Sequence, residues 1–442
     1  LIKDATIWTN EAEGVLEGMD ILLQDGKIKA IGEVLDVVDA STIVINGKGK
    51  HVTAGIIDEH SHIAVSRGVN ESGQASSAEV SIASVVNSDD INIYRQLAGG
   101  VTTSQLLHGS ANPIGGQSAI IKLKWGWTPE EMKYKNMPLF IKFALGENVK
   151  QSNWGAYNTV RFPQTRMGVE QVYYDHFLRA KAYDVKWSEY NSLKTSKKNN
   201  AITVPPRRDL ELETLAQILN KERYISCHSY VQSEINMLMK VADSMGFTLN
   251  TFTHILEGYK VADKMKAHGA GGSTFSDWWA YKYEVRDAIP HNASLLNEMG
   301  VITAVNSDDA EMARRLNQEA AKGIKYGGMS EEDALKMVTL NPAKLLHIDD
   351  RVGSLKAGKD ADVVVWSKHP LSIYAKPEQT IVDGYILFDK NMDKLQRSKI
   401  ASERTRLIAK MLKAKLGGEE TQPIKEKKNR IHNCNVFSDD GN

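Results

Sequence analysis

The chain has 442 residues, and its 55 lysines and arginines are balanced by 55 aspartates and glutamates. This neutral balance gives no general attraction to nucleic acid, so we expect no nucleic-acid partner. No run approaches the roughly 18 consecutive apolar residues of a spanning helix, so we do not expect a protein integral to a membrane. Two cysteines cannot form a disulfide framework. Localisation stays open between cytoplasmic and exported, and we allow for a native N-terminus, with any signal peptide, upstream of Leu1.

Both ends of the chain carry the pattern of β-sheet. Asp-Gly pairs interrupt apolar runs within residues 21–31 and again within residues 379–388, and a further apolar run covers 361–366. The Asp-Gly pair favours a tight hairpin because both turn residues tolerate a positive φ. We therefore predict a small β-sandwich domain formed by both chain ends, from residues 1–50 and 350–393.

Between these ends, apolar helical patterns stop at a glycine and pass within a few residues into a β-branched run. This happens four times, at Gly100, Gly246, Gly269 and Gly300. Glycine supplies the left-handed helix cap, and a strand just beyond it is typical of the αβ unit of a parallel sheet. Repeated units of this kind suit a TIM barrel or a doubly wound sheet, which places an α/β domain at residues 51–349.

Two segments depart from this rhythm. An insertion between Gln151 and Arg223 contains helical patterns at 168–193 and 210–220, the second with Asp209 as its N-cap. Residues 394–442 form a charged, helix-prone segment followed by a polar tail. We expect the helix to be solvated or packed rather than a membrane anchor.

His60 and His62 follow an apolar strand-like run with one residue between them. Residues two apart on a strand point to the same side, so this pair can bind one ion, although two surface histidines are the plainer alternative. Further polar residues favour the metal site because each follows a predicted strand, at the edge where βα barrels assemble their sites. These residues are Glu147, His228, His254 and Asp308. Imidazole and carboxylate ligands suit Zn²⁺, Mn²⁺ or Fe²⁺.

These segments resemble the metal-dependent amidohydrolase superfamily, particularly its imidazolonepropionase-like branch. The resemblance extends from Ile2 to about Phe388. It depends on AGIIDEHSH at 54–62, ALGEN at 144–148, CHS at 227–229, TH at 253–254, NSD at 306–308, NPA at 341–343 and GSLKAGKDAD at 353–362. It implies a TIM (β/α)8 barrel with a small β-sandwich domain, in agreement with the two hairpin regions.

The resemblance also implies metal ligands. His60, His62 and Asp308 would hold one ion, and His228 and His254 a second where two are present. Many two-metal members bridge the ions with a carboxylated lysine late on the fourth strand. We prefer Glu147 as the bridge because it already carries a carboxylate, with Lys142 as the alternative bridging ligand. A helix-dipole partner for Glu147 and a solvated strand position for Lys142 are the structural alternatives.

The resulting functional hypothesis is a metal-dependent hydrolase of C–N bonds in a small amide, a dipeptide or a cyclic amide. One or two divalent ions, Zn²⁺ first and Mn²⁺ or Fe²⁺ as alternatives, would activate water. Asp308 would act as ligand and as general base, returning the proton to the leaving nitrogen. A homo-oligomer is compatible with the sequence.

Two other functions are alternatives to the hydrolase hypothesis. A deaminase of the same superfamily typically pairs the fifth-strand histidine with a glutamate three residues on, but Val231 occupies that position and the nearest glutamate is Glu234. A noncatalytic scaffold would have lost its ligands, whereas all the positions above hold competent residues.

Three residues are candidates for substrate binding. Gln117 ends a glycine-rich segment that could form a loop at the barrel mouth, and a plain turn is the alternative. Tyr230 could orient a substrate carbonyl, or pack in the core. Arg166, in the insertion, could meet a carboxylate, although a surface role is favoured.

Overall fold

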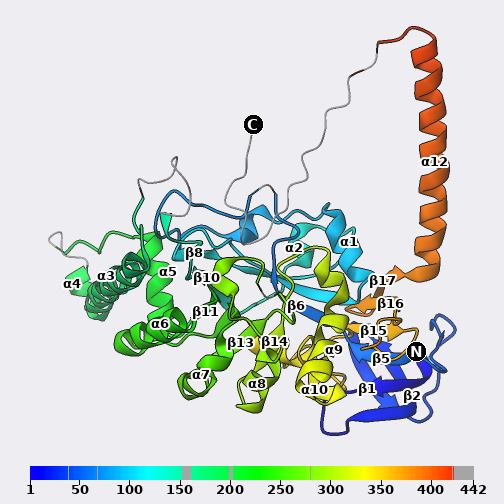
Figure 1. Cartoon of the computed structure of the whole chain (residues 1–442), viewed down its shortest axis with the longest axis horizontal. Coiled ribbons are helices and arrows are strands. Elements are labelled where there is room, and N and C mark those ends of the chain that lie inside the picture. The colour runs from blue at the N-terminus through cyan, green and yellow to red at the C-terminus, as the bar shows by residue number, and fades with distance from the viewer. Residues whose placement is uncertain are drawn as a thin grey trace.

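The computed structural model describes residues 1–37, 39–66, 68–151, 161–198, 203–278, 280–420 and 422. The body combines a β-sheet built from the chain ends with an α/β region built from the middle (Figure 1). Among the described residues, no helix combines the length and apolarity needed to cross a bilayer. The predicted polar tail beyond Gln422 lies outside the described residues.

The terminal sheet joins the two chain ends. Its main path runs β17-β16-β15-β5-β1-β2-β3, and β4 pairs with β1. Strand β5 pairs antiparallel with β15, which places Ala54 opposite Val363. The pairing links all eight strands into one continuous hydrogen-bonded sheet. The strands are β1 (Ile2–Trp8), β2 (Val15–Gln24), β3 (Lys27–Gly32), β4 (Ile45–Asn46), β5 (His51–Ala54), β15 (Val363–Trp366), β16 (Pro377–Val382) and β17 (Tyr385–Asp389).

Both predicted hairpins are confirmed. Gln24 pairs with Lys27 across the first turn, and Val382 pairs with Tyr385 across the second. The aspartate and the glycine of each turn have positive φ, between 48° and 81°. This is the backbone that a two-residue hairpin turn requires, and Asp-Gly adopts it readily.

The central region contains the parallel strands that the αβ pattern predicted. Strands β10 to β14 pair in parallel in chain order, and β6 pairs in parallel with β7. The consecutive strands β8 and β9 run antiparallel to β10 and to β7, and so connect the two groups. The strands are β6 (Ile56–Ser61), β7 (Val101–Leu106), β8 (Ile114–Gln117), β9 (Ala119–Lys122), β10 (Leu139–Ala144), β11 (Arg223–Ser229), β12 (Thr251–His254), β13 (Gly271–Thr274) and β14 (Thr303–Val305).

Strand pairing does not close this region into a complete barrel in the described part of the chain. No ladder joins β14 to β6. The two strands approach one another just beyond β14, where the Asp308 N–H donates to the His60 carbonyl over 3.1 Å. That contact brings two predicted metal ligands together.

Helices connect these strands and cover them (Figure 1). Gly246 and Gly269 end their helices with φ of 80° and 86°, which confirms two of the predicted glycine caps. The connecting helices are α1 (Ile91–Leu97), α2 (Pro129–Met132), α6 (Gln232–Met245), α7 (Ala262–His268), α8 (Asn292–Glu298), α9 (Leu316–Gly327), α10 (Glu331–Lys336) and α11 (Leu340–Leu345). Short 3₁₀ turns are η1 (Ile82–Val85), η3 (Gly258–Lys260), η4 (Tyr283–Val285) and η5 (Met312–Arg315).

The insertion forms helices that pack on the central region. It contains α3 (Arg166–Ser192), α4 (Thr195–Lys198) and α5 (Leu210–Leu219). The Asp209 carboxylate accepts the Leu212 N–H, as predicted for the N-cap of α5. Phe177 of α3 stacks on Phe247, with ring centroids 4.1 Å apart.

A buried ion-pair cluster, here called the Lys122 cluster, connects the central region to the terminal sheet. The Lys122 ammonium lies 2.7 Å from Asp360, 3.2 Å from Asp362 and in contact with Asp383. Asp360 also pairs with Lys27 at 2.6 Å and with Arg351 at 2.9 Å. These carboxylates raise the Lys122 pKa despite its burial.

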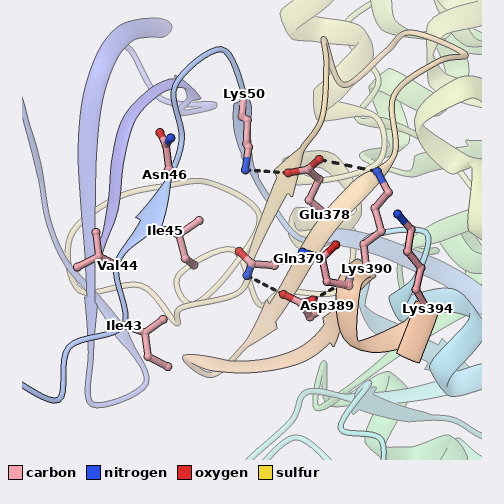
Figure 2. A pocket seen from close by; sticks show the side chains of 11 residues that line it. Ile43, Val44, Ile45, Asn46, Lys50, Glu378, Gln379, Asp389, Lys390 and Lys394 are labelled. Carbon is pink, nitrogen blue, oxygen red and sulfur yellow. Dashed lines mark hydrogen bonds and ion pairs between the residues drawn. The ribbon is translucent and has the colours of Figure 1, made fainter. Parts of the chain in front are cut away.

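The last described helix, α12 (Lys390–Leu416), projects from the body, and none of its residues is buried (Figure 1). A cavity of about 280 Å³ lies at its base (Figure 2). There Glu378 pairs with Lys50 at 2.7 Å and with Lys390 at 3.8 Å. None of the predicted site residues lines this cavity.

Candidate metal centre

His60, His62 and Asp308 form a compact group. One ligand atom from each lies within 4.8 Å of the others. The Asp308 Oδ1 atom is 3.2 Å from His62 Nε2 and 3.5 Å from His60 Nε2, and all three side chains are buried. The strand that ends at Ser61 therefore places both histidines beside the aspartate that follows β14, as the sequence predicted.

The Nδ1 atom of His62, on the side of the ring away from Asp308, fixes how the ring is oriented. Its Nδ1 lies 2.9 Å from the Leu107 carbonyl oxygen, which can only accept a hydrogen bond. Nδ1 therefore carries a proton, and Nε2 faces the Asp308 carboxylate. Metal-binding histidines are commonly oriented in this way by a carbonyl on the opposite nitrogen.

His228 and His254 extend this group from the neighbouring strands β11 and β12. Their ring centroids are 4.7 Å apart, and the His254 ring is 4.6 Å from that of His60. Within the described residues, neither ring nitrogen of His228 or His254 has a hydrogen-bond partner. Four imidazoles and one carboxylate thus converge on one place.

Burial keeps three of these imidazoles neutral. It lowers the pKa of His254 to about 3 and that of His60 and His228 well below the usual value, and neighbouring positive groups contribute to each shift. Burial opposes ionisation of Asp308, but the hydrogen bond from His62 and nearby positive groups lower its pKa to about 2. Neutral imidazole and ionised carboxylate are the forms that bind metal ions.

Two of the clustered residues have unusual backbone conformations. His254 has φ of 67° and Asp308 has φ of 49°, in the left-handed region that residues other than glycine rarely occupy. Such positions cost of order 1–3 kcal/mol and concentrate at functional sites, where the surrounding structure holds them.

The two candidates for the bridging position differ sharply in placement. Lys142 is fully buried in β10, and its Nζ lies 3.1 Å from His60 Nε2. The structural alternative of a solvated lysine is therefore wrong. Glu147 is only half-buried, its N–H donates to Glu284, and it is not part of the compact ligand group. The geometry favours Lys142 over the preferred Glu147.

Asp58 binds Ser307, the residue before the candidate ligand Asp308, and was not singled out from the sequence. Its carboxylate accepts the Ser307 N–H over 3.1 Å and also the Ser307 hydroxyl. Burial raises the Asp58 pKa to about 7. The signal that could have identified it is its position two residues before His60, on the same side of the strand.

Tyr230 lies beside the histidines. Its ring is 4.6 Å from the His228 ring and 5.8 Å from the His254 ring, measured between centroids. The Tyr281 hydroxyl donates to the Tyr230 hydroxyl over 3.0 Å, and Lys282 Nζ lies 4.2 Å above the Tyr230 ring.

The other two substrate-binding candidates contact protein groups. Gln117 belongs to strand β8 rather than to a loop, and its amide donates to the Ala78 carbonyl and to Thr214. Arg166 does meet carboxylates, but they are Glu234 and Glu284 of the chain itself. Sequence reasoning missed Lys282 and Glu284, and the aromatic-rich segment after β13 was the available signal.

The residues present fit divalent transition metal ions. The donor set is imidazole and carboxylate, and His60, His62 and Asp308 lie within reach of a shared ion. In the described part of the chain, neither ring nitrogen of the two further imidazoles has a hydrogen-bond partner. Such a set suits zinc, manganese or iron.

The comparisons with known proteins agree with this geometry. A model of the amidohydrolase family matches residues 201–392. A solved amidohydrolase from Thermotoga maritima MSB8 is 31% identical, and the match covers 88% of this chain and 99% of that chain with a TM-score of 0.78. The chain belongs to the amidohydrolase superfamily, which confirms the resemblance found in the sequence.

Other relatives are more distant. The amidohydrolase tasK of Hapsidospora irregularis is 29% identical over 88% of this chain, and the chain spans only 43% of its length. A Xaa-Pro dipeptidase solved with bound methionine is 14% identical, with a TM-score of 0.54 over 87% of this chain and 98% of that chain. The atrazine chlorohydrolase TrzN of Arthrobacter aurescens TC1, solved with zinc, is 15% identical, with a TM-score of 0.52 over 90% of this chain and 99% of that chain. The last two likenesses show a shared fold.

Proposed function

We propose that this chain is a metal-dependent hydrolase that cleaves a C–N bond in a small amide, a dipeptide or a cyclic amide. The observation that carries the proposal is the convergence of His60, His62, His228 and His254 on Asp308. Membership of the amidohydrolase superfamily supports the same class of reaction.

The proposed function includes a proposed architecture. We infer that β6 to β14 form a TIM barrel. In this barrel, β8 and β9 together take the place of the third strand, and each runs antiparallel to its neighbour. We also infer that residues 1–50 and 350–393 form the accessory β-domain. The strand order and the Asp308–His60 backbone contact support this closure.

The ligand assignment follows the geometry. His60, His62 and Asp308 would hold one ion, His228 and His254 would hold a second, and Lys142, as a carboxylated lysine, would lie between them. Zinc is the first choice. When bound, such ions lower the pKa of a coordinated water from about 15.7 toward about 7 and polarise a carbonyl oxygen.

The protein side chains would handle the proton and the substrate. Asp308 is ionised at neutral pH, so it can accept a proton and return it to the leaving nitrogen. The Tyr230 ring lies beside the His228 ring, and its hydroxyl would orient the scissile carbonyl. Burial of the Cys227 thiol raises its pKa, which argues against a cysteine nucleophile.

The test is a screen of the metal-reconstituted full chain against N-acyl amino acids, dipeptides and cyclic amides. Metal-dependent release of an amine product supports the proposal. Release of ammonia alone from an aromatic heterocycle would indicate the deaminase. Absence of bound transition metal, with no turnover after addition of Zn²⁺ or Mn²⁺, would favour the noncatalytic scaffold.

A further inference from the structure

We propose that Arg166, the first residue of insertion helix α3, is a positioning residue for the candidate site. It clamps two buried carboxylates, Glu234 and Glu284. Through Glu284 it holds Lys282 over the Tyr230 ring. The kinetic part of this inference depends on the proposed hydrolase function, whereas its structural part does not.

The clamp joins three elements that are distant in sequence. Arg166 Nε lies 3.0 Å from Glu234 Oε1 in α6, and Arg166 Nη2 lies 2.8 Å from Glu284 Oε1 in η4. The two glutamate side chains are 6% and 1% exposed, whereas the arginine is 41% exposed. A partly exposed guanidinium therefore neutralises two carboxylates that cannot reach water easily.

The loop after β10 is held by the same carboxylates. Glu284 Oε1 accepts the Glu147 N–H over 2.9 Å, and Glu234 Oε1 accepts the Gly146 N–H over 3.3 Å. A Cβ atom at Gly146 would lie 2.6 Å from Glu284 Oε1, and Gly146 has φ of 85°. Only glycine allows the backbone to approach the carboxylate this closely.

Lys282 links the Arg166 clamp to the candidate metal centre. Its Nζ lies 3.3 Å from Glu284 Oε2, 3.4 Å from Asn148 Oδ1 and 4.2 Å from the centroid of the Tyr230 ring. The Tyr230 ring in turn contacts the His228 ring. An unbroken series of contacts thus runs from the insertion to the histidines.

Charge balance explains why Arg166 would control the position of Lys282. The cluster holds two cationic side chains, Arg166 and Lys282, against two buried carboxylates. Without Arg166, both carboxylates would compete for the Lys282 ammonium, which would be drawn away from the Tyr230 ring. Burial already raises the Glu234 pKa to about 7, which shows how poorly this place tolerates an uncompensated carboxylate.

Hydrogen–deuterium exchange of the full chain tests the structural part. In Arg166→Met, backbone amides of residues 281–285 and 146–148 should exchange roughly tenfold faster, because their anchoring contacts are weakened. Arg166→Lys should lie between this variant and the wild type. The matched control is Arg179→Met, which removes another arginine of α3 that is 43% exposed and pairs with Asp175 and Glu211. Unchanged exchange in Arg166→Met would overturn the inference.

Kinetics with a substrate from the screen test the functional part. Arg166→Met and Lys282→Met should each lower kcat/KM by roughly 10- to 100-fold, the scale expected when a group near the chemistry is misplaced. The double variant should be no worse than Lys282→Met alone, because both changes disrupt one connection. Arg166→Lys should restore part of the loss, and Arg179→Met should leave kcat/KM unchanged.

The outcomes separate the two proposals. Additive losses in the double variant would refute the connection through Lys282. A wild type that hydrolyses no substrate would refute the proposed function, and the exchange measurement would still decide whether Arg166 positions the segment that carries Lys282.

Discussion

The candidate metal centre and the Lys122 cluster are both buried assemblies of charged and titratable groups, but their polar atoms are satisfied differently. In the Lys122 cluster, the ammonium contacts three carboxylates, and Asp360 has two further cationic partners. In the metal centre, His228 and His254 have no hydrogen-bond partner for either ring nitrogen within the described residues.

This difference in hydrogen-bond partners distinguishes a cluster that stabilises the fold from a site that binds a ligand. Buried polar groups are normally satisfied inside the protein, because an unsatisfied group costs roughly 1–3 kcal/mol. The Lys122 cluster connects two parts of the fold. Asp362 Oδ2 has no hydrogen-bond partner within the described residues, but each charged side chain of the cluster meets the requirement through at least one ion pair. The histidines do not meet it, which is expected of groups whose partner is a bound ion. The predictions below test this contrast from the largest expected effect to the smallest.

Replacing Asp308 should have the largest effect. Asp308→Asn keeps the side-chain shape but removes the carboxylate that would accept and return the proton. Turnover should fall by roughly 10²- to 10⁴-fold. Steady-state kinetics of the metal-reconstituted variant measures the loss, and elemental analysis should show that at least part of the metal is retained. Turnover equal to that of the wild type would refute the role of Asp308.

Replacing Lys122 should destabilise the protein without touching the metal centre. Lys122→Met leaves three carboxylates without their shared cation, and breaking a buried pair in this way costs roughly 3–5 kcal/mol. Lys133→Met is the control, because its pair with Glu130 is more exposed and contributes roughly 0–1 kcal/mol. Urea unfolding measures both. Equal stabilities for the two variants would contradict the structural role of the cluster.

Removing a metal ligand should weaken metal binding more than folding. His228→Ala is expected to lower metal affinity by at least roughly 10- to 100-fold, because even residues that only support ligands have effects of that size. His268→Ala is the control, since that histidine pairs with Asp243 instead. Metal titration gives the affinities. Comparable metal affinity in the two variants would exclude His228 as a ligand.

The acid stability of the Lys122 cluster should show the smallest effect. Burial raises the Asp360 pKa, but Lys122, Lys27 and Arg351 outweigh it and lower the pKa to about 2, below the unfolded value of about 3.9. The contribution of Asp360 to stability is therefore complete above about pH 4 and disappears as the pH falls through about 2. Urea unfolding between pH 2 and 5 should show a shallower loss for Asp360→Asn than for the wild type. Identical slopes would count against this assignment.

The sequence was most informative where chemistry depends on local spacing. His60 and His62 are two residues apart at the end of a strand. His228 and His254 lie at the carboxyl ends of β11 and β12, and Asp308 follows β14, so their convergence followed from the geometry of parallel sheets. The two Asp-Gly hairpins were predicted for the same local reason.

Features that depend on contacts between residues far apart in the sequence were harder to predict. The preferred bridging residue was Glu147 because its carboxylate is visible in the sequence, whereas the burial of Lys142 beside His60 depends on the tertiary fold. Arg166, Glu234 and Glu284 come from three separate elements, and no short-range pattern connects them. The antiparallel direction of β8 and β9 is likewise invisible to hydrophobic periodicity, which does not encode strand direction.

The pairing of β5 with β15 has a consequence for synthesis on the ribosome. Ala54 emerges long before its partner Val363, and at 5–20 residues per second the delay is roughly 15–60 s. Throughout that interval the nascent chain presents an edge strand that can pair with other polypeptides. The β5 edge of the terminal sheet therefore stays open to pairing with another chain until β15 has been synthesised.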